Sequence, residues 1–492
     1  MRKVIDMQMK IGETAIANIK FDPKSRDEIP KLLRGLQAIY GDKEVCKQVF
    51  DALLQLIPSH IDTNTGREGM DLWKIFVLGA LRLTCNWDYD KLHEIANNHD
   101  KLRKMLGHGS MDADYQYGLQ TLKDNIALFT PEILDRINQI VVKYGHKIAG
   151  KKKDEKLTGS CDSFVVETNV HFPTDINLLF DALRKILTLI MAICGGMHFS
   201  EWRQGKHHIR KIKKLFRAAQ QLKHAATKDP VKKAKRKELI IQAHQTYIDM
   251  AQVYIDRVRQ TLLNFDSADI MMWLRISQIQ NYIQHAERQI DQIRRRVVEG
   301  ETIPHAEKVF SLFEPHTEWI SKGKAGVPVE LGLKVCIVKD QFQFILHHQV
   351  MQKATDDQIA VSIIKEVQQR FASFRECSFD KGFHSPANQN ELGVILDHCV
   401  LPKKGKLSAI RKEIENSEEF KRARRKHSAV ESSINALENH GLDRCPDHGI
   451  HGFKRYVAMA VVARNIEILG QMLLQEELKK ERRQDNKIRS AA

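Results

Sequence analysis

Three carboxylates stand where they could hold a pair of metal ions, although they lie far apart in the chain. Asp162 is at the start of a strand-like segment, Asp380 ends a later one, and Glu431 falls in a segment with helical spacing. Two divalent ions about 4 Å apart can make water or a hydroxyl nucleophilic and stabilise the leaving oxygen of a phosphodiester, and hard oxygen ligands hold them. The three acids therefore suit metal-dependent phosphoryl transfer, provided that the fold brings them together.

Each acid taken alone has a simpler interpretation. Asp162 alternates with apolar residues on one face of its strand, which is an odd place for an unpaired charge but not a site by itself. Asp380 begins a D-K-G string, which is typical of a turn. Glu431 lies beside the apolar stripe of its helix. Only the order and the structural placement of all three acids together favour a metal site.

The segments around these acids alternate between strand and helix patterns. Strand-like stretches occur at 161–172, 327–350 (a hairpin-like pair), 374–380 and 394–402, with a helical stretch at 356–371. The order is strand, helical insert, two strands, helix, strand, helix, strand, helix. This order predicts an α/β domain of the RNase-H-like type that is interrupted after its first strand.

The part of the chain before the first strand is predicted to be an all-α N-terminal domain, 1–155. Apolar residues recur at three- and four-residue spacing in Lys31–Tyr40, Lys43–Leu56, Asp71–Thr84, Tyr89–Asn97 and Pro131–Val142. Short helices joined by tight turns suit a helix-turn-helix-like reader of DNA ends, but they equally suit any small helical bundle. A charged stretch, KKKDEK at 151–156, reads as a linker.

The predicted helical insertion, 201–312, is strongly basic at its start. Between Glu201 and Glu238 there are 14 Lys and Arg residues against three acids, a local excess of +11 in a chain whose net charge is +16. A field of this size attracts a polyanion, most commonly nucleic acid, whereas a mixed-sign run would be an ordinary solvated face. The candidates for contact with phosphates here are Lys206, Arg210, Lys213 and Lys214.

Longer stretches of the sequence resemble the DDE transposases of bacterial insertion sequences. CDSFVVETNVHFPTD (161–175) resembles the first catalytic motif of that family, and SFDKGFHSP (378–386) resembles the second, D-[KR]-G-[FY]. The segment at 427–470 resembles the third, with V-E on a helix and a closing G-[FL]-x-R-Y-V…A-R-N helix, while 313–332 resembles an internal motif. The resemblance is strong over 160–200 and 310–470 and weaker over 30–110.

The resemblance implies a fold and an activity. Asp162, Asp380 and Glu431 become the DDE triad, which holds two Mg²⁺ ions (with Mn²⁺ as a substitute) in an RNase-H-like catalytic domain formed by 156–200 and 313–470. The expected reaction is cleavage and strand transfer of double-stranded DNA at the element ends and the target, by a homodimer in the DNA complex. A charged tail, 471–492, follows.

Further cations flank the motifs and are expected to contact phosphates, which would position DNA without reading its sequence. These residues are Lys322, Lys324, Lys381, Lys403, Lys404 and His427.

The third motif departs from one family pattern. Some related transposases carry Tyr, Arg and Lys at seven residues before, four before and seven after the glutamate. This chain has Arg424, His427 and Glu438 at those positions. Glu431 is therefore the least secure of the three acids, Glu438 is the alternative ligand, and His427 takes the place of an arginine at the scissile phosphate.

Other classes of protein are disfavoured. The first residues, MRKVIDMQMKIGE, contain no apolar stretch of the kind found in a secretory signal, and we identify no window of the roughly 18 apolar residues that a membrane span requires. The eight cysteines form no C-x-x-C pair, and Cys445, Asp447 and His448 lack the further ligands of a zinc site. We therefore expect a cytoplasmic, nucleoid-associated protein that does not interact with membranes.

Two alternatives to the active transposase stay open. One is a catalytically inactive, transposase-derived DNA-binding protein, and the other is an RNase-H-like nuclease that only hydrolyses DNA. The unbroken motif context of all three acids counts against degeneration, and a nuclease has no need of an end-reading domain and a large basic insertion.

Overall fold

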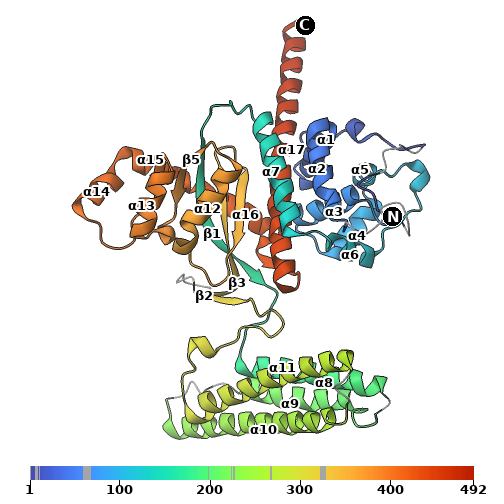
Figure 1. The fold of residues 1–492 in the computed structure, drawn as a ribbon, viewed down its shortest axis with the longest axis vertical. Helices are drawn as coiled ribbons and strands as arrows, with labels where there is room; N and C mark the ends of the chain where they lie inside the picture. Colours follow the sequence, from blue (N-terminus) through green and yellow to red (C-terminus); the bar gives the residue numbers. More distant parts are fainter. Residues whose placement is uncertain are drawn as a thin grey trace. The chain divides into compact units, whose positions relative to one another are not determined.

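The computed structural model describes residues 2–5, 9, 11–58, 68–197, 199–222, 224, 228–265, 269–321 and 328–491, with the side chains up to residue 486. The chain forms two compact units (Figure 1). The first comprises Met1–Asn169 and Ile320–Ala492, and the second comprises Val170–Trp319. The second unit is thus inserted into the first between two of its strands.

The first unit begins with helices whose starts are set by side-chain caps. Asp27, Asp42, Asp88 and Thr130 each accept a hydrogen bond from a backbone N–H in the first turn of the helix that follows. The five helices predicted in this region are confirmed, and two further short ones, α5 and α6, were not predicted. The helices are α1 Glu28–Gly41, α2 Lys43–Leu54, α3 Leu72–Thr84, α4 Tyr89–Asn98, α5 Asp100–Met105, α6 Leu119–Ile126 and α7 Pro131–Ile148.

The strands of the described residues form one seven-stranded mixed sheet, which makes the first unit an α/β structure. The main order is β2-β3-β1-β5-β6, and β4 pairs with β3 while β7 pairs with β1. β1 runs antiparallel to β3, β3 antiparallel to β4, and β1, β5 and β6 run parallel. The strands are β1 Leu157–Thr168, β2 Glu318–Ser321, β3 Val329–Asp340, β4 Ile345–Val350, β5 Phe374–Phe379, β6 His398–Val400 and β7 Arg444–Cys445.

The predicted order of strands and helices is found, with several differences. β1 begins at Leu157, so Asp162 lies within the strand and not at its start as predicted, and the short elements β2, β7, α14 and α15 were not predicted. Residues 394–402, predicted as a single strand, divide between the end of α13 and β6, because Ser385 and Pro386 start a helix that runs on to Ile395. The helices are α12 Asp356–Arg370, α13 Pro386–Ile395, α14 Ala409–Asn416, α15 Glu418–His427, α16 Ala429–Leu437 and α17 Gly449–Ala491.

The long helix α17 is the centre of the first unit's helical layer. It packs against α1, α3, α7 and β4 (Figure 1). Its crossing with α1 is close, since a Cβ on Gly35 would collide with the carbonyl oxygen of Ile466 and one on Gly470 with that of Lys31. Glycine at both positions lets the two helix backbones approach each other where a side chain would hold them apart.

An apolar window within Gly449–Asn486 meets the length and composition of a membrane-crossing helix, contrary to the sequence analysis, which identified no such window. In the structure 78% of this window is buried inside the protein. Its apolar character is therefore accounted for by burial among the surrounding helices and the sheet.

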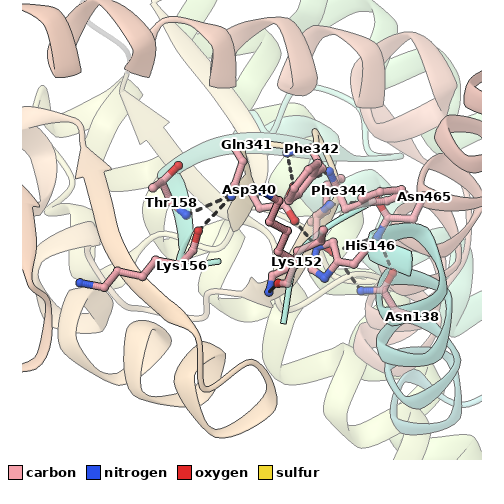
Figure 2. Close-up of polar contacts among 12 residues, drawn as sticks. Asn138, His146, Lys152, Lys156, Thr158, Asp340, Gln341, Phe342, Phe344 and Asn465 are labelled. Carbon is pink, nitrogen blue, oxygen red and sulfur yellow. Dashed lines mark hydrogen bonds and ion pairs between the residues drawn. The ribbon is translucent and has the colours of Figure 1, made fainter. Parts of the chain in front are cut away.

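Buried polar contacts fasten α7 and α17 to the β3–β4 hairpin (Figure 2). His146 on α7 lies 2.5 Å from the carboxylate of Asp340, which also accepts hydrogen bonds from the backbone N–H groups of Phe342 and Phe344. Asn465 on α17 donates to the carbonyl of Ile345 at 2.9 Å and accepts from its N–H at the same distance. Burial raises the pKa of Asp340, and these donors offset part of that effect.

The second unit is a set of long helices with its own apolar core. α8 packs against α9 and α11, and α10 packs against α9 and α11. Tyr247 and Ile279 are among the fully buried residues. The sequence analysis placed 156–200 in the catalytic domain, whereas α8 packs with the insertion helices because its apolar face is completed by theirs. The helices are α8 Asp175–Gly196, α9 Gly205–Gln221, α10 Pro230–Leu262 and α11 Ile270–Ile293.

The close crossing of α1 and α17 gives a test of this packing. We expect Gly35→Ala to lower the free energy of unfolding by about 1–3 kcal/mol, because the added methyl group forces the two backbones apart. Gly41→Ala, in the same helix, has open space around its Cβ and is expected to leave stability unchanged or raise it slightly. Urea denaturation followed by circular dichroism measures both. Equal stabilities for the two variants would contradict the close contact.

Candidate active site

Strand pairing brings two of the predicted acids to neighbouring positions. β1 and β5 run parallel, and the last pair in their register is Cys161 beside Phe379. The next residue of β1 is Asp162, and the residue that follows β5 is Asp380. Neighbouring strands lie about 4.8 Å apart, so the two carboxylates leave the sheet side by side.

The third predicted acid reaches the same place from a helix. Glu431 lies in the first turn of α16, which packs against β1. Val430 and Leu437 are fully buried and fasten this helix, whereas Glu431 itself is exposed. Glu438, the alternative ligand, begins a π-helical turn at the end of α16.

The pKa of Asp162 reflects its burial first and the charges of the other acids second. Its half-buried position raises the pKa of Asp162 to about 6, and the negative charges of Asp380, Asp356 and Glu431 act in the same direction. A hydrogen bond of 2.8 Å from the backbone N–H of Ser163 opposes the rise. A carboxylate among other carboxylates is stabilised by a cation, and this is the condition under which a metal ion binds.

Asp356 is a neighbouring acid that the sequence analysis missed. It stands at the start of α12, where Ser163 Oγ donates to it at 2.7 Å and Lys334 Nζ at 2.8 Å. Its sequence context, a capping box beginning at Thr355, indicated only the start of a helix. Because Lys334 already balances its charge, Asp356 is less suited to a metal ion than the three predicted acids.

A chain of side-chain hydrogen bonds starts from the residues two positions before Asp162 and Asp380 on the same strands. Ser160 Oγ is 2.9 Å from Ser378 Oγ, and Ser378 Oγ is 3.0 Å from His427 Nδ1. Burial lowers the pKa of His427, although the charges of Asp380 and Glu431 raise it. Its Nε2 atom is buried without a hydrogen-bond partner among the described residues. His427 is thus held next to the acids, with one ring nitrogen unused.

Lys339 of β3 occupies the same row. Its ammonium group donates to Gln343 Oε1 at 2.8 Å, to the Ala429 carbonyl at 2.6 Å and to Ser433 Oγ at 3.1 Å. Burial lowers the pKa of Lys339 to about 8. The sequence offered no signal for this residue, because its acceptors lie in the following turn and in a helix about ninety residues further along the chain.

A cavity of about 930 Å³ adjoins this row beneath α15. Its lining includes Ser160, Lys339, Ser378, Arg422 and Lys426, and none of the three predicted acids belongs to it. The chemistry expected of the acids therefore belongs to the place where β5 ends beside the middle of β1, next to the cavity and not within it.

The predicted phosphate contacts fall in different places. Lys206, Arg210, Lys213 and Lys214 are exposed on α9 of the second unit, and the last three line a groove of about 410 Å³ together with Arg217. α9 contains no Asp or Glu, so nothing within the helix balances these charges.

The other predicted cations lie in the first unit or outside the described residues. Lys381 directly follows Asp380 and is exposed. Lys403 and Lys404 lie after β6, half-buried and exposed respectively. Lys322 and Lys324 lie outside the residues that the structure describes.

Asp447 belongs to an ion-pair network. Arg455 lies 2.8 Å and Arg82 3.5 Å from its carboxylate. Arg82 is also stacked over the ring of Tyr89, with the guanidinium carbon 4.0 Å from the ring centroid. The carboxylate of Asp447 is therefore already engaged in ion pairs with two arginines.

Within the described residues no three His, Cys, Asp or Glu side chains stand close enough together to hold a metal ion as they are placed. The donor set nevertheless fits one: Asp162, Asp380 and Glu431 offer only hard carboxylate oxygens, and Asp380 and Glu431 are exposed and can turn toward a cation. Without a cation, mutual repulsion keeps such carboxylates apart.

No family model, curated protein or solved structure matches this chain. The assignment of the site thus depends on its own residues and on the motifs in which they stand.

The raised pKa of Asp162 has a measurable consequence for stability. Between about pH 4 and pH 6 the folded state binds this proton and the unfolded state does not, so the group's unfavourable effect grows as pH rises through this window. In EDTA we expect Asp162→Asn to raise the free energy of unfolding by about 1–2 kcal/mol at pH 7 and by nothing at pH 3.5. Asp154→Asn, at an exposed turn position, is the control. The same gain at both pH values would refute the raised pKa of Asp162.

Proposed function

We propose that this chain is a DDE transposase that cleaves the ends of its element and joins them to target DNA. One observation carries the proposal: Asp162 and Asp380 are neighbours on adjacent parallel strands, and Glu431 stands close enough for its charge to act on Asp162. All three acids lie within the motifs that resemble the transposase family. Metal-dependent phosphoryl transfer needs this set of ligands.

The topology of the sheet supports an RNase-H-like catalytic domain. Along the sheet the strands run β4-β3-β1-β5-β6, and β3 alone runs against the other four. Apart from the short strands β2 and β7, the first three strands in chain order (β1, β3 and β4) are thus neighbours, and β5 and β6 add on the other side of β1. The second unit interrupts this domain after its first strand, as the sequence analysis expected, but it begins at Val170 and not at the predicted residue 201.

Within the proposal the protein's own groups have distinct tasks. Asp162, Asp380 and Glu431 would hold two Mg²⁺ ions, or Mn²⁺ in their place, which supply a nucleophile of lowered pKa and neutralise charge on the phosphate. His427 is held through Ser378, and its buried Nε2, which has no hydrogen-bond partner among the described residues, would donate to a phosphate oxygen that enters the site. Lys381 adds positive charge directly after the second acid.

The surfaces of the two units support double-stranded DNA as the partner. The exposed cations of α9 form a one-sided basic face, which suits the phosphate backbone and carries no sequence information. Reading the terminal repeats is assigned to the helices before β1, and pairing two ends in one complex calls for a homodimer on DNA. These assignments, and a cytoplasmic, nucleoid-associated location, follow from the proposed activity.

The catalytic proposal is tested by removing metal ligands without changing side-chain size. We expect Asp162→Asn and Asp380→Asn to abolish cleavage and strand joining in Mg²⁺, since neutral amides hold divalent ions poorly. Binding to element ends should persist or tighten, because two negative charges near a phosphate are removed. Gel shifts and cleavage assays with and without Mg²⁺ measure both steps.

Asp397→Asn is the matched control, because Asp397 stands directly before the neighbouring strand β6 and its carboxylate forms an exposed ion pair with Lys156. It should cleave as the unaltered protein does. Retained cleavage in Asp162→Asn would refute the metal-ligand role. Binding without any cleavage by the unaltered protein would favour the inactive DNA-binding alternative, and hydrolysis without joining would favour the nuclease.

The role of α9 is tested by the salt dependence of DNA binding. Replacing Lys206, Lys213 and Lys214 together by Gln should weaken binding and reduce the slope of log K against log salt by about 3, because roughly one counterion is released per phosphate contact. A control that removes the same charge from the exposed surface of α17 uses Gln at Lys479, Lys480 and Arg482. An unchanged slope in the α9 variant would mean that these cations are an ordinary solvated surface and do not contact DNA phosphates.

A further inference from the structure

Lys339 is a buried cation that takes no part in the chemistry proposed above. It is 3% exposed and lies on β3 opposite Ser160 of β1. Two residues earlier on β3, Ile337 lies opposite Asp162. Lys339 and Asp162 therefore occupy successive rows of the same face of the sheet, about 7 Å apart along the strands.

The hydrogen bonds of Lys339 go mainly to the helix that carries Glu431. A buried ammonium group is tolerated only when its three N–H donors find acceptors. Lys339 has three, and two of them, the Ala429 carbonyl and Ser433 Oγ, belong to α16. These acceptors lie two residues before and two residues after Glu431, so the bonds fix both the position and the rotation of the turn between them.

The other contacts of α16, with β1, α15 and α17, are packing contacts. The helix has nine residues, its N-cap residue Ser428 makes no side-chain cap, and it passes into a π-helical turn in which Gly441 has a φ of +96°. Its buried residues Val430 and Leu437 fasten it to the core by non-directional contacts. A directional restraint is needed if Glu431 is to face the strands.

We propose that Lys339 is a positioning residue, which fastens α16 to β3 so that Glu431 faces Asp162 and Asp380. The inference rests on the proposed function for the role of Glu431, but the anchoring of the helix stands independently of it. Lys339 itself touches neither DNA nor metal ion in this scheme.

The first experiment compares Lys339→Met, Lys339→Arg and Lys365→Met, the last of which alters an exposed lysine of α12. Removal of an outer-shell partner typically costs 10–100-fold in metal affinity or activity, so we expect Lys339→Met to weaken Mn²⁺ binding, measured by electron paramagnetic resonance, by about tenfold. Cleavage should fall at least as much, while binding to element ends is unchanged. Lys339→Arg should recover part of the loss, and Lys365→Met should show none.

A double-mutant cycle separates positioning from general destabilisation. If Lys339 acts through Glu431, Lys339→Met adds no further loss of Mn²⁺ affinity in a Glu431→Gln background. Independent, additive losses would overturn the proposal.

Hydrogen exchange in the absence of metal and DNA keeps the inference apart from the proposed function. We expect the amides of 429–437 to exchange about tenfold faster or more in Lys339→Met while those of β1 are unchanged. A protein that neither binds Mn²⁺ nor cleaves would overturn the proposed function, and exchange would still decide the anchoring. Unchanged exchange in α16 would overturn the inference. If Lys339→Met does not fold, Ser433→Ala removes one acceptor and should shift exchange and affinity in the same direction by less.

Discussion

Repulsion among carboxylates is the constraint on the sheet edge where β1 and β5 run side by side. The parallel pairing of these strands gives Asp162 and Asp380 neighbouring positions, and α16 brings a third negative charge to them. Burial of Asp162 raises its pKa to about 6, and the negative charges of Asp380, Asp356 and Glu431 add to this rise. A cation would relieve this unfavourable burial of negative charge. The cluster is therefore better explained as a set of metal ligands than as a source of stability.

The surrounding residues limit this repulsion by different means. Lys334 pairs with Asp356, so the fourth acid contributes little unbalanced charge. Lys339 donates hydrogen bonds to α16, and its positive charge lies in the row of the sheet next to that of Asp162. Two lysines of β3 thus lie near the proposed site, where Lys334 pairs with an acid and Lys339 bonds to α16.

The end of β3 connects the site to the rest of the first unit. Consecutive residues of a strand point to opposite faces, so Lys339 reaches α16 while Asp340 reaches His146 on α7. α7 and α17 are in turn linked to β4 through Asn138 and Asn465, which share the Ile345 carbonyl. The helices before β1 and the helix bearing Glu431 are therefore fastened to the same hairpin.

The sequence by itself determined the order of strands and helices, the all-α start of the first unit, the basic run of α9 and the three acids with their motifs. These features follow from local periodicity, capping residues and charge, all of which can be recognised within short segments of sequence. The tertiary structure alone decided that Asp162 and Asp380 are adjacent, that Asp356 lies near them and that Lys339 bonds to α16. It also decided that α8 packs with the insertion helices and that the apolar part of α17 is buried. Each of these features depends on strand register or on packing between segments far apart in the chain. Such pairings are determined by the free energy of the whole fold, so neither segment alone shows a pattern that predicts them.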